Sequence, residues 1–225
     1  MLFSNILKPV DIADVYMKNI KIEYASSARF LGVIIDDKLK FNLHINEVAN
    51  KVSKNADVLY KLRNFEPNNT LLTVYRSIIE SHLNYCNLIF GNAFPTHLTP
   101  LVVAQKKAVR IVANKPPLSH TDPIFFNLKL LKLFDFYKYN LGVYMWRNIG
   151  KFEQNFHINI HNTRSGDHYE PGYQRLLLTQ NNSIYYQAPL NWCEIPDPII
   201  FSRSLQIFKR SYKKSILDSY QYVDY

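Results

Sequence analysis

Two adjacent carboxylates, Asp36 and Asp37, are the residues whose types could most readily support metal-dependent chemistry. Paired aspartates can bind Mg²⁺ and organise phosphoryl transfer. Here they follow Ile34 and Ile35 and precede Lys38, and no aromatic residue plus alanine stands directly before the pair. No third carboxylate occurs at a recognisable spacing. The pattern therefore favours a turn at the end of a strand over a metal site.

Histidines and cysteines are the other residues that could carry chemistry. His157, His161 and His168 lie close together, and two histidines four residues apart on a helix could share a zinc ion. No glutamate follows His157 directly and no Cys-x-x-Cys pair accompanies the histidines, so an incidental cluster is favoured. Cys86 and Cys193 lie in no nucleophile signature and form no disulfide framework, which fits a reducing, intracellular compartment. We therefore predict no catalytic residue and no metal ligand.

The composition is that of a folded, basic protein. Its 225 residues suit one large domain or two small ones, and a hydrophobic content of 47% excludes a disordered chain. The formal charge of +9 favours a polyanionic partner such as nucleic acid. Residues 41–150 carry thirteen basic and six acidic side chains, a net charge of +7, so most of the surplus lies in the middle of the chain.

Two further function classes are excluded by sequence pattern. None of the six glycines has the spacing of a Rossmann or P-loop site, so we expect no small-molecule nucleotide substrate. The longest uncharged run, residues 81–105, contains three asparagines and two prolines, so we expect no membrane span.

Apolar periodicity predicts strands followed by helices. Residues 16–41 read as two or three antiparallel strands, with a turn at 25–28, a continuous apolar run at 30–35 and a second turn at 36–38. Helical spacing follows over five segments, the first with Asn42 as a possible N-cap and the last with its basic residues facing outward: about 42–65, 70–83, 98–112, 129–148 and 202–218. The signals are weak between 150 and 200. We predict an α+β protein, mostly helical, in which a small N-terminal antiparallel β hairpin precedes a helical bundle and a looser C-terminal region with a final helix.

An ordered set of short motifs covers nearly the whole chain. Its segments are 30–36, 39–45, 51–52, 59–63, 71–79, 85–91, 105–111, 163–165, 188–192 and 208–209. Two of these segments are Gln105-Lys106-Lys107-Ala108-Val109-Arg110-Ile111 and Ala188-Pro189-Leu190-Asn191-Trp192; each motif alone is modest, and the order of the set is what is specific. Taken in this order, the set resembles the end of the reverse transcriptase of non-LTR (LINE-type) retrotransposons, with the jockey-like insect elements as the most similar pattern.

The resemblance implies roles for three parts of the chain. Residues 1–41 would be an end-of-palm segment in which the strand Phe30-Leu31-Gly32 matches the family's primer-grip hairpin, where a glycine lets a nucleic-acid backbone approach. Residues 42–150 would be a thumb-like bundle, which in this family holds the template–primer duplex. Residues 151–225 would be a C-terminal region with a terminal basic helix. The candidate phosphate contacts, chosen for their charge on predicted helix faces, are Lys51, Lys54, Lys106, Lys107 and Arg110.

The chain also departs from the family. The Tyr/Phe-Ala-Asp-Asp motif, the fingers, the first palm aspartate, the endonuclease domain and the terminal Cys/His knuckle are missing from this sequence. We therefore expect a non-catalytic fragment with sequence-independent template–primer binding and no cofactor of its own, since Mg²⁺ would belong to the missing palm. Two alternatives stay open: the C-terminal portion of a longer active polymerase truncated by gene modelling, and a domesticated structural or interaction module without nucleic-acid binding. The family implies a nuclear location, and the sequence does not indicate an oligomeric state.

Overall fold

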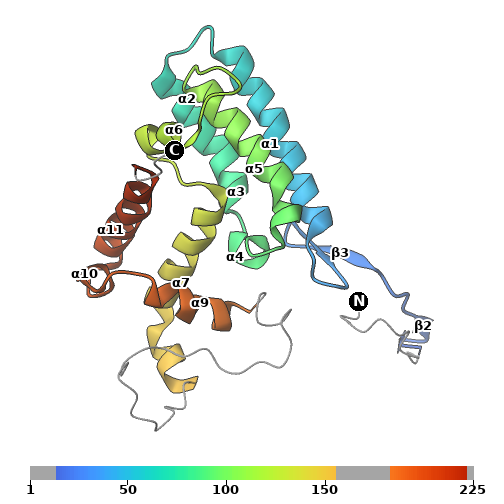
Figure 1. Ribbon diagram of the computed structural model, residues 1–225. Coiled ribbons are helices and arrows are strands. Elements are labelled where there is room, and N and C mark those ends of the chain that lie inside the picture. Colours follow the sequence, from blue (N-terminus) through green and yellow to red (C-terminus); the bar gives the residue numbers. More distant parts are fainter. Residues whose placement is uncertain (1–13, 156–182, 222–225) are drawn as a thin grey trace.

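The computed structural model describes residues 14–155 and 183–221, and most of this part is helical, as predicted (Figure 1). The strands form two separate antiparallel hairpins: β1 (Tyr16–Met17) with β2 (Ile20–Lys21), and β3 (Ser27–Phe30) with β4 (Val33–Asp36). The helices are α1 (Asn42–Leu62), α2 (Asn68–Tyr75), η1 (Arg76–Glu80), α3 (Ser81–Asn84), α4 (Asn87–Phe90), α5 (Pro95–Val112), α6 (Asp122–Leu128), α7 (Leu133–Asn155), α9 (Ile184–Cys193), α10 (Asp197–Ile200), α11 (Leu205–Asp218) and η2 (Ser219–Gln221). In the described residues, no helix has both the length and the apolar character needed to cross a bilayer.

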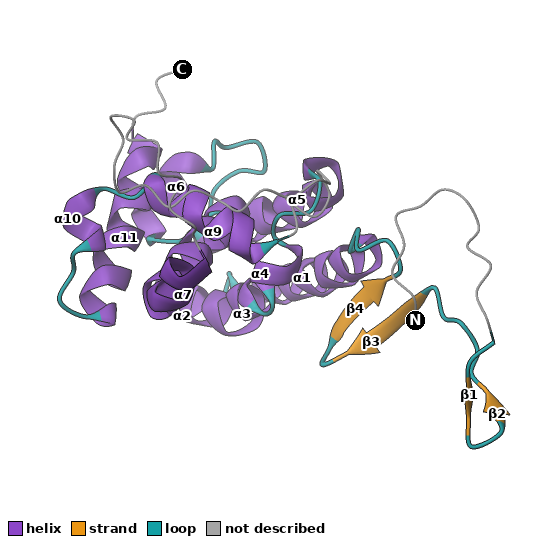
Figure 2. Cartoon of the chain, turned by 90° about the horizontal axis from the view of Figure 1, so that it is seen from below, coloured by secondary structure: helices purple, strands orange, loops and turns teal. Residues whose placement is uncertain are grey.

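The β3–β4 hairpin projects from one side of the helical body (Figure 2). Its register pairs Phe30 with Val33, so Leu31 and Gly32 form a two-residue turn in which both residues have positive φ, 45° and 82°. That is the geometry of the primed turns that match the twist of paired strands. Two predictions are wrong here: the turn expected at 25–28 lies partly in β3, and the apolar run 30–35 is a strand–turn–strand. Phe30, Leu31 and Gly32 therefore lie at a hairpin tip and not within one continuous strand.

The turn predicted at Asp36 is confirmed, and it leads directly into α1. The Asp36 carboxylate accepts hydrogen bonds from the backbone N–H groups of Lys38 (3.1 Å), Lys40 (3.0 Å) and Phe41 (2.6 Å). Phe41 has a left-handed backbone and stands at the N-cap position, without a side-chain cap. The expectation of Asn42 as N-cap is wrong, because the Asp36 side chain already organises the backbone that enters the helix.

Helices α1 and α5 pack side by side and form the centre of the bundle (Figure 1). Both bury alanines, Ala49 and Ala56 on α1 and Ala104 and Ala108 on α5. Small side chains let two helix backbones approach closely, which suits this pairing. Pro95 occupies the first turn of α5, where its missing N–H would have no intrahelical partner.

The predicted second helix is one continuous helical path through α2, η1 and α3. Its middle, Arg76–Glu80, has the wider π-helical winding, which changes the intrahelical hydrogen bonds of that turn. The side-chain amide of Asn55 donates to the backbone oxygen of Ile78 at 2.6 Å, so α1 supplies a partner there.

The start of the predicted fourth helix is wrong by four residues. Lys129 has a left-handed backbone (φ 54°) and ends α6, a helix that the sequence pattern did not indicate. Leu130 and Leu131 are buried in the linker, and α7 begins only at Leu133. Near the predicted end at 148, Asn148 has non-helical dihedrals and marks a kink, beyond which α7 continues to 155.

The C-terminal helices pack on α7. Residues 184–193, whose pattern did not indicate a helix, form α9, and α11 begins where the Ser204 hydroxyl accepts the N–H of Ile207 at 3.3 Å. Lys213 was expected to face outward with the other basic residues of this helix. It is instead half-buried, and burial lowers its pKa, while the Glu80 carboxylate partly offsets that shift.

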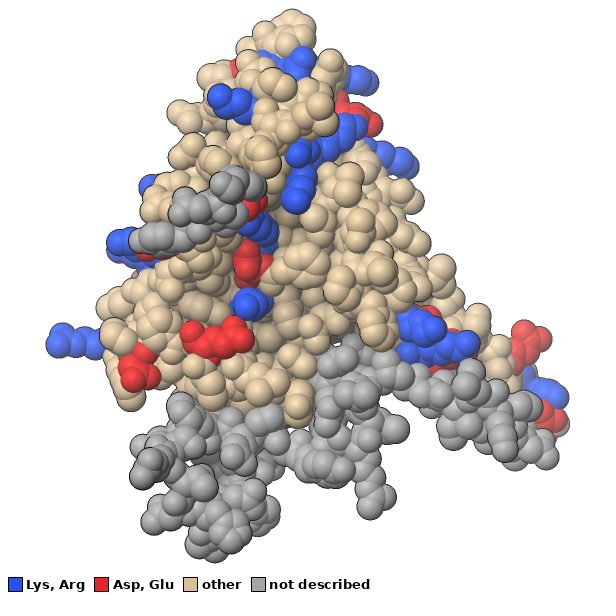
Figure 3. Space-filling model, in the orientation of Figure 1, with Lys and Arg blue, Asp and Glu red and all other residues tan. Residues whose placement is uncertain are grey.

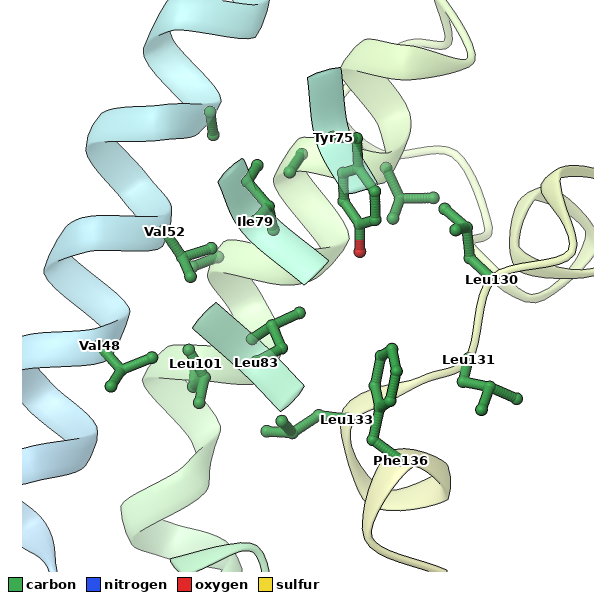
Figure 4. Close-up of a cluster of buried hydrophobic side chains, with 14 of the residues drawn as sticks. Val48, Val52, Tyr75, Ile79, Leu83, Leu101, Leu130, Leu131, Leu133 and Phe136 are labelled. Atoms are coloured by element: carbon green, nitrogen blue, oxygen red, sulfur yellow. The ribbon is translucent and has the colours of Figure 1, made fainter. Parts of the chain in front are cut away.

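Two clusters of buried side chains hold the protein together. The first joins β4, α1–α6, the start of α7, the end of α11 and η2. Figure 4 shows Val48 and Val52 of α1 near Leu101 of α5 and Leu83 of α3. The second joins α7, α9 and α11 through aromatic and aliphatic residues: Tyr137, Leu141, Met145, Phe152, Ala188, Trp192, Ile195, Phe208 and Tyr212.

Candidate nucleic-acid interface

The tip of the β3–β4 hairpin is apolar and exposed. Phe30 and Leu31 are 64% and 73% exposed, so they contribute little to the core. The Tyr85 hydroxyl, from the connection between α3 and α4, donates to the backbone oxygen of Leu31 at 2.6 Å. A Cβ placed on Gly32 would lie 3.6 Å from the same Tyr85 ring. The exposed tip is thus held against the helical body by one tyrosine.

The hairpin is also attached to α1 by an ion-pair cluster. The guanidinium of Arg29 on β3 reaches both carboxylate oxygens of Glu47, at 3.1 and 2.5 Å, and Lys51 reaches the same carboxylate at 2.7 Å. The hydrogen bonds from Arg29 and Lys51 lower the pKa of Glu47 to about 2. Bidentate pairing fixes orientation as well as distance, so the cluster sets the angle between the hairpin and α1.

A buried histidine supports the inner strand of the hairpin. The Nδ1 atom of His44 accepts the backbone N–H of Ile34 at 3.4 Å, and the ring meets Phe90 edge-on at 5.0 Å. Burial lowers the pKa of His44, which favours the neutral imidazole that such an acceptor needs. His44 lies in motif segment 39–45, but the sequence did not indicate this supporting role, because a lone histidine on an apolar helix face carries no periodic signal of its own.

The five predicted phosphate-contact residues lie on α1 and α5, as expected from the sequence. Lys51, Lys54 and Lys107 are exposed, whereas Lys106 and Arg110 are half-buried. Figure 3 shows Lys and Arg side chains over the upper part of the molecule, where Figure 1 places these two helices, with acidic side chains among them.

These five side chains differ in how far they are already engaged within the protein. Lys51 pairs with Glu47, and Lys107 pairs with Asp57 of α1 at 2.9 Å. The Nε of Arg110 donates to the backbone oxygen of Ser119 at 2.8 Å. Lys54 and Lys106 have no ion-pair partner in the part of the chain that the structure describes. We therefore define the α1–α5 basic surface as Lys51, Lys54, Lys106, Lys107 and Arg110, with Lys54 and Lys106 as its uncompensated charges.

The candidate metal sites receive no support from the described residues. Asp36 uses both carboxylate oxygens to hold its own turn. His157, His161 and His168 lie outside the described residues. Across residues 14–155 and 183–221, no group of three or more His, Cys, Asp or Glu side chains is placed to hold a metal ion.

Two residues from the ordered motifs are buried amides with a structural role. Gln105 is 1% exposed and bridges the linker before α7: its Nε2 donates to the oxygen of Leu131, and its Oε1 accepts the N–H of Leu133, both at 2.9 Å. Asn191 on α9 donates to the oxygen of Lys138 on α7 at 3.1 Å. The sequence placed Gln105 on the apolar side of its helix, and a polar residue there is the signal that identifies such a bridge.

Comparison with known proteins identifies relatives for part of the chain. The probable RNA-directed DNA polymerase from transposon X-element of Drosophila melanogaster is 24% identical over 173 residues, which are 75% of this chain and 17% of the relative. The RNA-directed DNA polymerases from mobile element jockey of Drosophila funebris and Drosophila melanogaster are 27% and 28% identical, over 59% and 51% of this chain and 15% and 13% of theirs. No protein-family model and no solved structure matches.

These relatives bear on the resemblance described above. They confirm its coarser part, a relationship to retrotransposon RNA-directed DNA polymerases. The chain spans less than a fifth of the length of each of them.

Proposed function

We propose that this chain is a non-catalytic portion of a retrotransposon RNA-directed DNA polymerase that holds a template–primer duplex. The relatives suggest the class of partner, since their names describe enzymes that copy RNA into DNA. The observation that carries the proposal is the α1–α5 basic surface, where basic side chains lie on two helices that pack against each other.

The chemistry of this surface suits phosphates and not bases. Lysine ammonium groups on a helix exterior can neutralise phosphate oxygens without reading sequence. Lys54 and Lys106 need no internal partner to be displaced before they do so. Lys107 would exchange its contact with Asp57 for a phosphate, which makes Asp57 an internal competitor of the duplex.

The hairpin tip would complete the interface on the side of α1. Phe30 and Leu31 present apolar surface on a turn that Tyr85 holds in place, and Gly32 lets this turn adopt its positive φ beside the Tyr85 ring. The Arg29–Glu47–Lys51 cluster joins this tip to the α1–α5 basic surface, so both would contact one duplex in a fixed relation.

Salt-dependent binding to a blunt RNA–DNA duplex tests the proposal. We expect the affinity to fall steeply with salt. A plot of the logarithm of the binding constant against the logarithm of the salt concentration should fall with a slope of about 0.9 for each phosphate neutralised on duplex DNA. Replacing Lys54 and Lys106 by alanine should reduce that slope by about 2, because two phosphate contacts are lost. The matched control is R210A/K214A, which removes two exposed charges from α11 and should leave the slope unchanged. Absence of binding at low salt, or binding that salt does not weaken, would overturn the proposal.

A second test removes the Asp57 carboxylate, which competes with the duplex for Lys107, and is expected to strengthen binding. Asp57→Asn frees Lys107, so we expect tighter duplex binding by severalfold at low salt. Glu194→Gln is its control, since it also removes one negative charge and frees one lysine, Lys138, but that pair joins α7 to the end of α9 and involves neither α1 nor α5. Equal gains in both variants would show that net charge alone acts, without a defined surface.

A further inference from the structure

A cavity of about 340 Å³ lies beside the hairpin base, apart from the residues assigned to the α1–α5 basic surface. Four separate parts of the chain form its wall: the turn before α1, the connection from α4 to α5, the first turn of α7, and α9. Its lining residues are Lys38, Leu39, Lys40, Gly91, Asn92, Ala93, Phe94, Pro95, Phe134 and Gln187. This volume lies within the range of small-ligand sites in proteins.

The lining combines two kinds of chemistry. Phe94 and Phe134 are 47% and 43% exposed, although aromatic rings of this size usually bury most of their surface. Lys38 and Lys40 supply two exposed ammonium groups, and the described residues of the lining include no Asp or Glu. Charge complementarity therefore selects an anionic ligand, and the exposed rings select one with a flat face.

The wall of the cavity is held by the protein before any ligand arrives. A single Asp36 oxygen accepts the N–H groups of both Lys38 and Lys40, which fixes the backbone that carries the two ammonium groups. The backbone oxygen of Phe94 accepts the N–H of His97 at 2.9 Å, and the two rings meet edge-on at 5.7 Å. A preformed site loses less conformational entropy on binding.

The start of α5 adds to the positive potential. Pro95, which lines the cavity, is the first residue of this 18-residue helix, and no side chain caps the helix N-terminus. The helix dipole places partial positive charge at that end. This partial charge adds to the attraction of Lys38 and Lys40 for an anion.

We propose that this cavity binds one unstacked nucleotide of a single-stranded segment that continues from the duplex. Its base packs against Phe94 and Phe134, and its phosphate contacts Lys38 and Lys40. Base–aromatic stacking together with a basic groove is how proteins hold single strands without reading sequence. This inference rests on the proposed function, since it adds a single-strand contact to a duplex-holding surface.

The test compares a blunt RNA–DNA duplex with the same duplex carrying a single-stranded overhang that contains 2-aminopurine. The wild-type chain should bind the overhang form more tightly and quench the 2-aminopurine fluorescence as the base stacks. F94L/F134L should weaken binding of the overhang form by about fivefold to a hundredfold, the range of base–aromatic stacking, and leave the blunt duplex unaffected. The control is F65L/F201L, which changes two phenylalanines, 84% and 80% exposed, that do not line the cavity.

A second variant keeps the test decisive if F94L/F134L does not fold. K38S/K40S changes two exposed side chains, and it should weaken overhang binding and reduce the salt slope for the overhang by about 0.7 for each phosphate lost. Unchanged overhang binding in this variant would overturn the inference.

The remaining outcomes separate the inference from the proposed function. Equal binding of blunt and overhang duplexes by the wild type overturns the cavity site and leaves duplex holding intact. Binding of neither overturns both. If free 2-aminopurine nucleotide binds as tightly as the overhang, the ligand is a soluble nucleotide and the strand assignment is wrong. Displacement of the overhang by an acidic peptide at equal concentration would assign the cavity to a protein partner instead.

Discussion

The two buried clusters of this protein are built from different side chains. The first, around α1, α2 and α5, is mainly aliphatic, with residues such as Val52, Leu59 and Leu101 fully buried. The second, around α7, α9 and α11, is rich in large rings, with Trp192 and Phe208 at its centre. Aliphatic side chains fill space between long helices, whereas rings meet in preferred geometries that tie short, distant elements together.

Each cluster also contains one buried amide that links helices. Gln105 connects α5 to the linker before α7, and Asn191 connects α9 to α7 and to the Tyr212 hydroxyl of α11 at 3.3 Å. The hydrogen bond that the Gln105 side chain donates to the backbone (2.9 Å) is shorter than the one that Asn191 donates (3.1 Å). Gln105 is also more deeply buried. Removal of Gln105 is therefore expected to cost more stability than removal of Asn191.

The largest expected effect is at these two amides. Gln105→Leu leaves the oxygen of Leu131 and the N–H of Leu133 buried without a partner, and each such group costs about 1–3 kcal/mol. We therefore expect the free energy of unfolding to fall by about 2–5 kcal/mol in urea denaturation. Asn191→Leu should cost less, about 1–3 kcal/mol, because its bonds are longer and its site is less deeply buried. A larger loss at Asn191 would reverse this ranking.

The second prediction concerns the rings. Phe208 has three ring neighbours, Trp146, Trp192 and Tyr212, at 5.6–6.1 Å between centroids. Since each aromatic pair adds about 0.5–1.5 kcal/mol beyond buried area, Phe208→Leu should lower the free energy of unfolding by about 2–4 kcal/mol. Among the described residues, Phe125 in the first cluster has no comparable ring contact, so Phe125→Leu should cost less than about 1.5 kcal/mol. Equal losses in thermal or urea unfolding would mean that ring geometry does not distinguish the clusters.

The third prediction concerns close packing of α11 on α7. A Cβ at Gly142 would lie 2.5 Å from the Tyr212 ring and 3.1 Å from Ile195, so Gly142→Ala should destabilise by about 1–3 kcal/mol. A Cβ at Gly150, also in α7, meets no described residue within 4 Å. Gly150→Ala should therefore stabilise by up to about 1 kcal/mol through helix propensity. Calorimetry of the two variants should give shifts of opposite sign, and a stabilised Gly142→Ala would contradict this packing.

The smallest effect on stability is expected for the exposed ion pairs of Glu47. Glu47 has a lowered pKa of about 2, so its ion pairs stabilise the folded state above the ordinary glutamate pKa and are lost as the pH falls from about 4.5 to 2. Exposed pairs contribute less than about 1 kcal/mol. The stability of Glu47→Gln and wild type should therefore differ at pH 6 and converge near pH 2. Urea midpoints followed across that range measure this convergence.

Much of the first region could be predicted from the sequence. The spacing of Ile45, Val48, Val52 and Leu59 predicted α1 within three residues of its end, because a long amphipathic helix repeats its signal many times. α6, α9 and α10 were not predicted, because a helix of four to ten residues repeats the pattern too few times. The hairpin turn was misplaced, because Leu31 adopts a left-handed backbone that only glycine and asparagine usually adopt.

Some features of the candidate site could likewise be predicted from the sequence, and others could not. The sequence identified the charged residues of α1 and α5, because charge and helix face can be read locally. It could not show that Lys51 and Lys107 are already paired, since Lys107 and Asp57 are 50 positions apart. It also gave no sign that Lys38 and Phe134 line one cavity, because that depends on how α7 crosses the start of α5.

By itself, the sequence determined the mostly helical class, the basic middle of the chain and the relationship to retrotransposon polymerases. Composition, periodicity and motif order can be read from the order of residues in the chain alone. Only the tertiary structure decided which charges remain uncompensated, where the hairpin tip lies, and which rings and lysines share a cavity. Those depend on contacts between residues far apart in the chain, which form only when the two clusters pack.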